Sequence, residues 1–93
     1  MRKTIFITGA TSGFGKACAY KFAQNGHRLI LAGRREDRLK TEADNLIQQY
    51  NIEVFTLNFD IRDRNAVKLA IDSLPTDWNN IDILLNNAGL AAG

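Results

Sequence analysis

The sequence has few of the residues that mark several classes of protein. It contains one cysteine in 93 residues, so no internal disulfide can form, which suits a reducing compartment. It contains one proline and no low-complexity tract, which excludes a collagen or a disordered linker. No apolar run has the length of a membrane span, and no signal peptide precedes the first strand pattern. We therefore expect a cytoplasmic protein with no membrane partner.

The sequence also lacks a large excess of positive or negative charge. Twelve Lys and Arg residues stand against ten Asp and Glu residues, giving a formal net charge of +2. The basic residues are mixed with acids, and no basic stripe is interleaved with aromatics, so we expect no nucleic-acid partner. There is one histidine, and no set of Cys, His and carboxylates has the spacing of metal ligands. No metal site is predicted.

The chain has an ordinary globular composition, with 45% hydrophobic residues, and its length fits one domain spanning residues 1–93. Four apolar runs predict strands. Two of them, around Leu29-Ile30-Leu31 and Ile83-Leu84-Leu85, are apolar continuously, which is typical of strands buried on both faces of a parallel sheet. The predicted strands are Thr4–Thr8, Arg28–Ala32, Glu53–Asn58 and Ile81–Asn86.

Three helical patterns separate these strands. Their apolar residues recur at spacings of three and four, and Asp63 is a plausible N-cap of the third. The apolar residues are Cys18, Ala19, Phe22 and Ala23; Leu39, Ala43, Leu46, Ile47 and Tyr50; and Val67, Ala70, Ile71 and Leu74. The order β-α-β-α-β-α-β predicts an α/β fold: the first part of a Rossmann-type doubly wound parallel sheet, with strand order 3-2-1-4.

A glycine-rich loop follows the first strand, where ligands bind in such sheets. Gly9 allows a sharp turn off the strand, Gly13 allows the backbone to approach a pyrophosphate, and Gly15 allows the next helix to pack closely. The helix N-terminus and the hydroxyls of Thr11 and Ser12 would add donors for phosphate. Three glycines also suit an ordinary tight turn, so the loop alone leaves both interpretations open. A P-loop is excluded, because its glycine spacing and its Lys-Ser/Thr pair are absent.

The spacing Gly-x-x-x-Gly-x-Gly behind Thr8 resembles the short-chain dehydrogenase/reductase family over the whole chain. Two further motifs match: the aspartate after strand three, Asp60, and the family motif Asn-Asn-Ala-Gly, which is Asn86 to Gly89 here. Phe14 and the stretch from Leu74 to Ala91 are similar to bacterial NADP-dependent 3-hydroxy acid dehydrogenases. The resemblance implies that Asp60 contacts the adenine and that the motif lines the ribose side of the cofactor. The cofactor-binding residues it adds are Phe14, Asp60, Ile61, Asn87, Ala88 and Gly89.

The end of the second strand indicates NADP rather than NAD. Enzymes that use NAD place a carboxylate there for the ribose 2′-hydroxyl, but this chain has Gly33 followed by Arg34 and Arg35. A guanidinium can bind a 2′-phosphate in a bidentate manner, whereas a carboxylate would repel it. The alternative is that both arginines merely begin a charged helix, the interpretation that we adopt for Arg38 and Lys40.

The family's catalytic Tyr-x-x-x-Lys pair is absent, since Gln24 follows Tyr20 by four residues and Val54 follows Tyr50. We therefore predict no catalytic residue in the 93 residues and regard them as a fragment of a longer enzyme. That enzyme would oxidise a 3-hydroxy acid or reduce a small carbonyl, as a dimer or tetramer. The alternatives are a non-catalytic NADP-binding module and, with least support, a protein that binds another nucleotide or nucleic acid.

Overall fold

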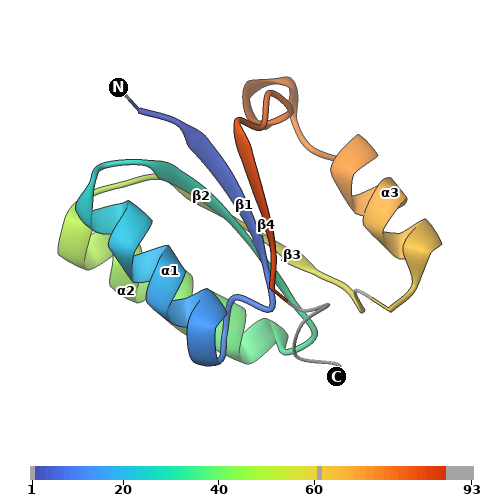
Figure 1. The fold of residues 1–93 in the computed structure, drawn as a ribbon, viewed down its shortest axis with the longest axis horizontal. Helices are drawn as coiled ribbons and strands as arrows, with labels where there is room; N and C mark the ends of the chain where they lie inside the picture. The colour runs from blue at the N-terminus through green and yellow to red at the C-terminus, as the bar shows by residue number, and fades with distance from the viewer. Residues whose placement is uncertain (1, 61, 88–93) are drawn as a thin grey trace.

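The computed structural model describes residues 2–60 and 62–87. Strands and helices alternate along the chain, and a short 3-10 helix, η1, precedes the last strand (Figure 1). Among residues 2–60 and 62–87, none of the helices could span a lipid bilayer. The elements are β1 (Thr4–Thr8), α1 (Gly13–Gln24), β2 (Arg28–Gly33), α2 (Glu36–Tyr50), β3 (Val54–Asn58), α3 (Arg64–Asp72), η1 (Thr76–Trp78) and β4 (Ile83–Asn86).

The four strands form one parallel sheet in the order β3-β2-β1-β4, which confirms the predicted fold class and strand order. The order reverses at β1, whose neighbours are β2 and β4. Thr8, the last residue of β1, lies opposite Ala32 of β2 and Asn86 of β4. The carboxyl ends of three strands therefore meet where the glycine loop begins.

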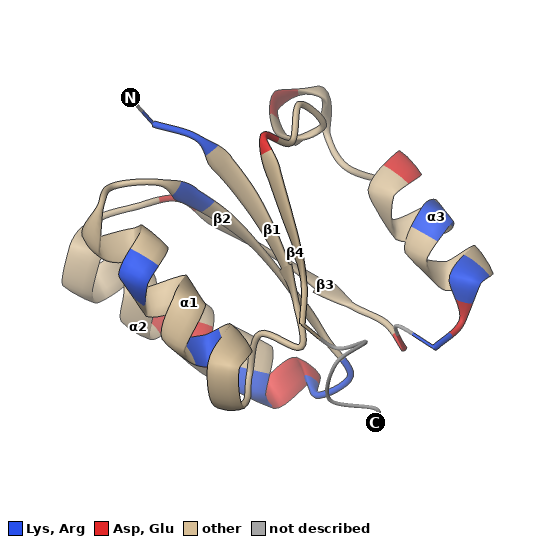
Figure 2. Cartoon of the chain, viewed as in Figure 1, with Lys and Arg blue, Asp and Glu red and all other residues tan. Residues whose placement is uncertain are grey.

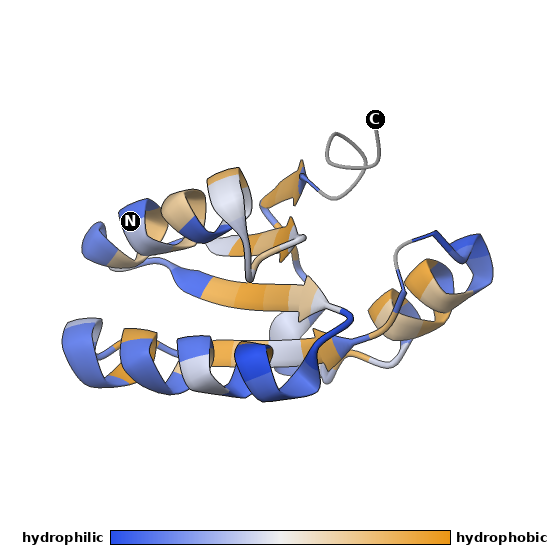
Figure 3. Cartoon of the chain, turned by 90° about the horizontal axis from the view of Figure 1, so that it is seen from below, coloured by the Kyte–Doolittle hydropathy of each residue, from blue (hydrophilic) through white to orange (hydrophobic). Residues whose placement is uncertain are grey.

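Helices α1 and α2 cover one face of the sheet, and α3 lies over the other (Figures 1 and 3). Alternate residues of the two central strands supply the two cores. Ile5, Ile7, Leu29 and Leu31 pack under α1 and α2, whereas Phe6 and Ile30 pack with Leu74 on the other face. The interpretation of a continuous apolar run as a doubly buried strand is thus correct for β2, and β1 is buried in the same way.

Strand β4 is an edge strand, and Leu84 on it is 58% exposed. The predicted start of β4 at Ile81 is two residues early. The Asp82 carboxylate accepts the Thr4 N–H at 2.8 Å, while the Asp82 N–H donates to the Thr4 carbonyl at 2.9 Å. A side chain thus replaces one bond of the strand ladder, and regular pairing begins at Ile83.

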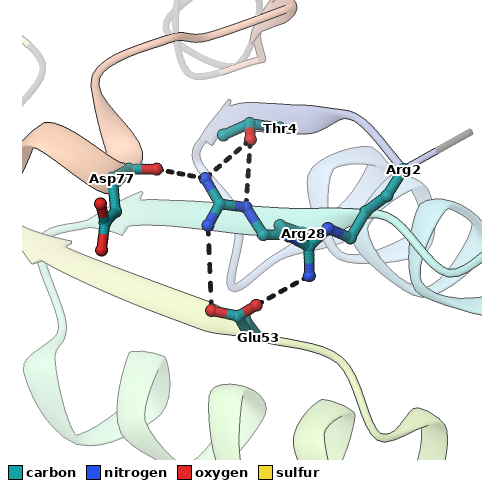
Figure 4. A network of polar contacts seen from close by, with 5 residues as sticks. All are labelled: Arg2, Thr4, Arg28, Glu53 and Asp77. Atoms are coloured by element: carbon teal, nitrogen blue, oxygen red, sulfur yellow. Dashed lines mark hydrogen bonds and ion pairs between the residues drawn. The ribbon is translucent and has the colours of Figure 1, made fainter.

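Arg28 links three elements at the amino end of the sheet (Figure 4). Its guanidinium donates to Thr4 Oγ1 and to the Asp77 carbonyl, lies 3.8 Å from the Glu53 carboxylate, and stacks 4.1 Å from the Trp78 ring centroid. The Arg28 side chain is only 12% exposed. Since η1 carries Asp77 and Trp78, this guanidinium attaches η1 to β1 and β2.

Replacing Arg28 with leucine should lower the free energy of unfolding by about 1–3 kcal/mol, because partly buried charge-assisted hydrogen bonds and a cation–π contact are lost. Chemical denaturation measures this. Arg2→Ala is the matched control, since Arg2 pairs with the same Glu53 at 2.8 Å but is exposed, so its removal should cost less than about 1 kcal/mol. Equal losses for the two variants would contradict the assigned role of Arg28.

Candidate functional site

The glycine loop leaves β1 at its carboxyl end and enters α1. Gly9 and Gly13 have φ values of 61° and 51°, in the left-handed region that favours glycine. The Ala10 N–H donates to the Ala32 carbonyl at 3.2 Å, which fixes the start of the loop to the end of β2. A Cβ added to Gly13 would meet no atom within 4 Å, so the backbone there borders open space.

Gly15 is required by close packing inside the loop. A Cβ at this position would lie 2.2 Å from the Gly9 carbonyl oxygen and 2.8 Å from Asn87 Nδ2. Asn87 is buried, and its Nδ2 donates to the same Gly9 carbonyl at 3.1 Å. The residue after β4 thus holds the turn after β1 against the first turn of α1. The sequence indicated close helix packing at Gly15 but not this hydrogen bond.

The N-terminus of α1 lacks a side-chain cap. Ser12 occupies the N-cap position, and its hydroxyl makes no capping hydrogen bond. At the start of α3, by contrast, the predicted N-cap Asp63 accepts the N–H groups of Asn65 and Ala66. Uncapped N–H groups and the positive end of a helix dipole are suited to an anion.

A pocket of about 740 Å³ opens beside this helix N-terminus. It gathers predicted residues from all four strand ends: Gly9, Thr11, Ser12, Arg34, Arg35, Asp60 and Asn87. Gly13, Phe14 and Gly15 do not line it, and the Phe14 side chain is 62% exposed. The predicted residues Ile61, Ala88 and Gly89 lie outside the described part of the chain.

Arginines dominate the charge of the pocket. Arg34 and Arg35 follow β2, and Figure 2 shows basic segments where β2 leads into α2, at the end of the sheet where α1 begins. Within residues 2–60 and 62–87, no carboxylate forms an ion pair with either residue. Arg34 acts on Asp60 only as a nearby charge. Both guanidinium groups are therefore available to an external anion.

Asp60 and Arg62, which follow β3, form an exposed ion pair that also borders the pocket. Arg62 Nη2 lies 2.8 Å from Asp60 Oδ2, and the Arg62 backbone N–H donates to Oδ1 at 3.0 Å. Hydrogen bonds from the Arg62 side chain and backbone lower the pKa of Asp60 to about 2, so its carboxylate is charged at neutral pH. Asp60 and Arg62 together thus add polar groups to the pocket but little net charge.

Sequence reasoning missed several residues of the pocket, Ala32 among them. Arg38 was assigned to a solvated helix face, but it lines the pocket, as do Arg62 and Phe59. One signal was present for Arg38: it stands one helical turn after Arg35, the N-cap of α2, and residues at that spacing share a face. Phe59 packs against the core and borders the pocket as well.

Glu42 on α2 is a buried carboxyl that the apolar pattern of this helix did not indicate. It is 5% exposed, and Oε2 has no hydrogen-bond partner in the described part of the chain. Burial raises the pKa of Glu42 from 4.5 to about 7, although the charge of Lys16 acts in the opposite direction. The folded protein therefore binds this proton more tightly than the unfolded chain does.

Stability should consequently fall as the pH rises from about 4.5 to 7 and stay reduced above that range. Glu42→Gln removes the ionisation, so above pH 7 it should raise the free energy of unfolding by about 1–3 kcal/mol. Urea unfolding at pH 5 and pH 8 checks this. The gain should be small at pH 5, and a gain that is equal at both pH values would contradict the assignment.

Comparison with known proteins places these features in a family. The family model of the short chain dehydrogenases matches residues 3–93. Two relatives are an NADP-dependent 3-hydroxy acid dehydrogenase of Salmonella typhi, 45% identical over 96% of this chain and 34% of the relative, and serine 3-dehydrogenase of Agrobacterium fabrum, 47% identical over 100% and 36%. This chain spans about a third of the length of these relatives.

A solved structure has the same arrangement. L-Sorbose reductase from Gluconobacter frateurii, complexed with NADPH and L-sorbose, superposes with a TM-score of 0.88 at 34% identity, covering 95% of this chain and 34% of that one. The strand order, the glycine loop and the family match agree with one another. The chain belongs to the short-chain dehydrogenase family.

Proposed function

We propose that the chain is the part of a short-chain oxidoreductase that binds NADP(H), and that residues 1–93 belong to one dinucleotide-binding domain. One observation carries the proposal: an uncapped helix N-terminus behind a glycine loop shares a pocket with arginines that no carboxylate pairs in the described part of the chain. The helix N-terminus suits the pyrophosphate, and the arginines suit a separate phosphate group. Together they fit a dinucleotide that carries a third phosphate.

The pyrophosphate would lie against the first turn of α1. The loop from Gly9 to Gly15 fits this role, because no Cβ at Gly13 narrows the approach and Gly15 keeps the helix start close to β1. The hydroxyls of Thr11 and Ser12 border the pocket and would add donors. Phe14 is kept in the proposed site only through its backbone N–H, since its side chain does not line the pocket.

The 2′-phosphate would lie between the guanidinium groups of Arg34, Arg35 and Arg38. Gly33 has no side chain, so no carboxylate stands at the position that binds the ribose 2′-hydroxyl in NAD-dependent enzymes. Each charge-assisted hydrogen bond contributes roughly 1.5–3 kcal/mol, so one or two such bonds would favour NADP over NAD by about ten- to a thousandfold. Two relatives support this choice, one NADP-dependent by name and one solved with NADPH.

The adenine and its ribose would lie toward the ion pair of Asp60 and Arg62. Asp60 lines the pocket, and its bonds to Arg62 hold the carboxylate in place. Asn87 would face the ribose from the end of β4, where it already fixes the loop. Ile61, Ala88 and Gly89 are proposed for the same side from the family motifs alone.

For the whole protein we propose an NADP-dependent oxidoreductase that oxidises a 3-hydroxy acid, such as serine or allothreonine, or reduces a small carbonyl, and that assembles as a dimer or tetramer. The names of the two curated relatives support the hydroxy-acid class. The nicotinamide, when bound, supplies the hydride acceptor or donor, and residues 1–93 hold the nucleotide without a Tyr-x-x-x-Lys pair.

Fluorescence titration with NADPH and NADH at equal ionic strength tests the binding function. NADPH should bind at least about tenfold more tightly, as one retained 2′-phosphate hydrogen bond predicts. Failure of both nucleotides to bind would refute the proposal. Binding without turnover of serine, allothreonine or small carbonyls by the full-length protein would favour a non-catalytic NADP-binding module.

A further inference from the structure

Glu42 has no contact with the proposed nucleotide pocket, yet it borders a second, smaller cavity that shares two residues with it. This cavity, about 330 Å³, lies between α1 and α2, and the unpartnered, buried Glu42 carboxyl is part of its wall. Thr11 and Arg38 line both pockets. The other residues of the smaller cavity are Lys16, Tyr20, Asp37, Thr41 and Asn45.

Two cations connect Glu42 to the phosphate-binding region. Lys16 stands in the first turn of α1, and its positive charge acts on the Glu42 carboxyl. Arg38 stands one turn before Glu42 on α2, a spacing at which two side chains share a helix face. Glu42 forms no ion pair of 4 Å or less with either cation in the described residues. Lys16 is thus close enough to act on the carboxyl, and Arg38 lines the same cavity, but neither cation is held by Glu42.

We propose that Glu42 is a positioning residue that sets how strongly Lys16 and Arg38 attract the phosphates of NADP; the inference rests on the function proposed above. As a carboxylate, Glu42 draws these cations toward the smaller cavity and offsets their charge. As a neutral acid, it leaves both cations to the nucleotide. The protonated form should therefore bind NADP more tightly than the ionised form.

The Glu42 carboxyl changes its protonation near neutral pH, because burial raises its pKa to about 7. The other titratable groups that border the cavity are Tyr20 on α1 and Asp37 on α2. Strand β3 carries no titratable residue, and β2 carries only Arg28, which is held at the amino end of the sheet by Thr4, Asp77 and Glu53. Glu42 is thus the one buried carboxyl among the described residues at this boundary.

The test compares NADPH binding by the full-length protein and its Glu42→Gln variant between pH 6 and pH 8.5. Between these pH values the Kd of the unmodified protein should rise by about threefold more than the Kd of the variant. This is the size of effect expected when one negative charge appears near the NADPH phosphates and is partly screened by solvent and salt. Ionisation of the 2′-phosphate itself affects both proteins and cancels in the ratio of their Kd values. Calorimetry in buffers of different ionisation enthalpy should show proton uptake on binding near pH 7.5, and the variant should lose it.

Asp44→Asn is the matched control, since it removes one negative charge from an exposed position on the same helix. Its pH profile should follow that of the unmodified protein. Equal profiles for the unmodified protein and Glu42→Gln would overturn the inference while leaving the proposed function intact. A control that flattens the profile as much as Glu42→Gln would also overturn it, because surface charge alone would then explain the effect. Absence of NADPH binding at every pH would overturn both proposals.

Discussion

Gly15→Ala should unfold more readily than the unmodified protein and lose NADPH affinity. Alanine normally stabilises a helix relative to glycine by up to about 1 kcal/mol. Here the sign should reverse, because the new Cβ would stand 2.2 Å from the Gly9 carbonyl oxygen, which is backbone and cannot rotate away. Overpacking of this kind typically costs about 1–3 kcal/mol. Denaturation and NADPH titration measure the two effects.

The binding loss should follow from the same displacement. If the first turn of α1 shifts away from Gly9, the hydrogen bond from Asn87 to the Gly9 carbonyl is broken and the uncapped N–H groups move relative to the arginines. We expect at least a tenfold higher Kd, equivalent to about 1.4 kcal/mol. Gly15→Ala with unchanged stability and affinity would show that the loop is not closed as described.

Gly26→Ala is the control for backbone strain. Gly26 has a φ of 82°, but a Cβ there would meet nothing within 4 Å, and it lies at the other end of α1. The substitution should lower the free energy of unfolding by about 1 kcal/mol, only because alanine is strained at this positive φ. NADPH affinity should not change, so the comparison separates general destabilisation from damage to the loop.

The double variant Gly33→Asp with Arg34→Ala should reverse the cofactor preference from NADPH to NADH. The new carboxylate would accept a hydrogen bond from the ribose 2′-hydroxyl and repel the 2′-phosphate, while a phosphate-binding guanidinium is lost. The fold should accept the change, because Gly33 has no positive φ and its Cβ would make ordinary contacts of 3.5 Å or more with Leu39. The ratio of the two Kd values should shift by about ten- to a thousandfold.

Two single variants separate the effect of the new carboxylate from the effect of the lost guanidinium. Gly33→Ala adds a Cβ without a charge and should retain the preference for NADPH. Arg34→Ala should weaken NADPH and leave NADH unchanged, since NADH has no phosphate at that position. If the double variant still preferred NADPH, the 2′-phosphate would have to lie away from the end of β2.

The sequence predicted those features that depend on local chemistry and regular periodicity. The glycine loop was identifiable because left-handed turns at Gly9 and Gly13 favour one residue type, and the Asp63 cap because it satisfies two N–H groups in its own helix. The strand order followed from alternating elements with right-handed connections. Such features are determined by residues close in the chain or by general rules of topology.

What escaped prediction depends on packing between distant segments. The burial of Glu42 could not be inferred, since an apolar pattern registers a glutamate as a solvent-facing position. The same pattern placed Ile47 in the core, but it is 41% exposed. Asn87 was assigned to the cofactor from a motif, whereas its hydrogen bond to Gly9 joins residues 78 positions apart. Arg38 reaches the pocket only because α2 begins beside the glycine loop.

A crystal structure of the protein with NADP+ bound would test the central claim most directly. We expect the 2′-phosphate within hydrogen-bonding distance of the Arg34 guanidinium, and the pyrophosphate facing the N–H groups of the first turn of α1. A nucleotide bound with its 2′-phosphate directed away from the turn between β2 and α2, or bound outside this pocket, would contradict the account.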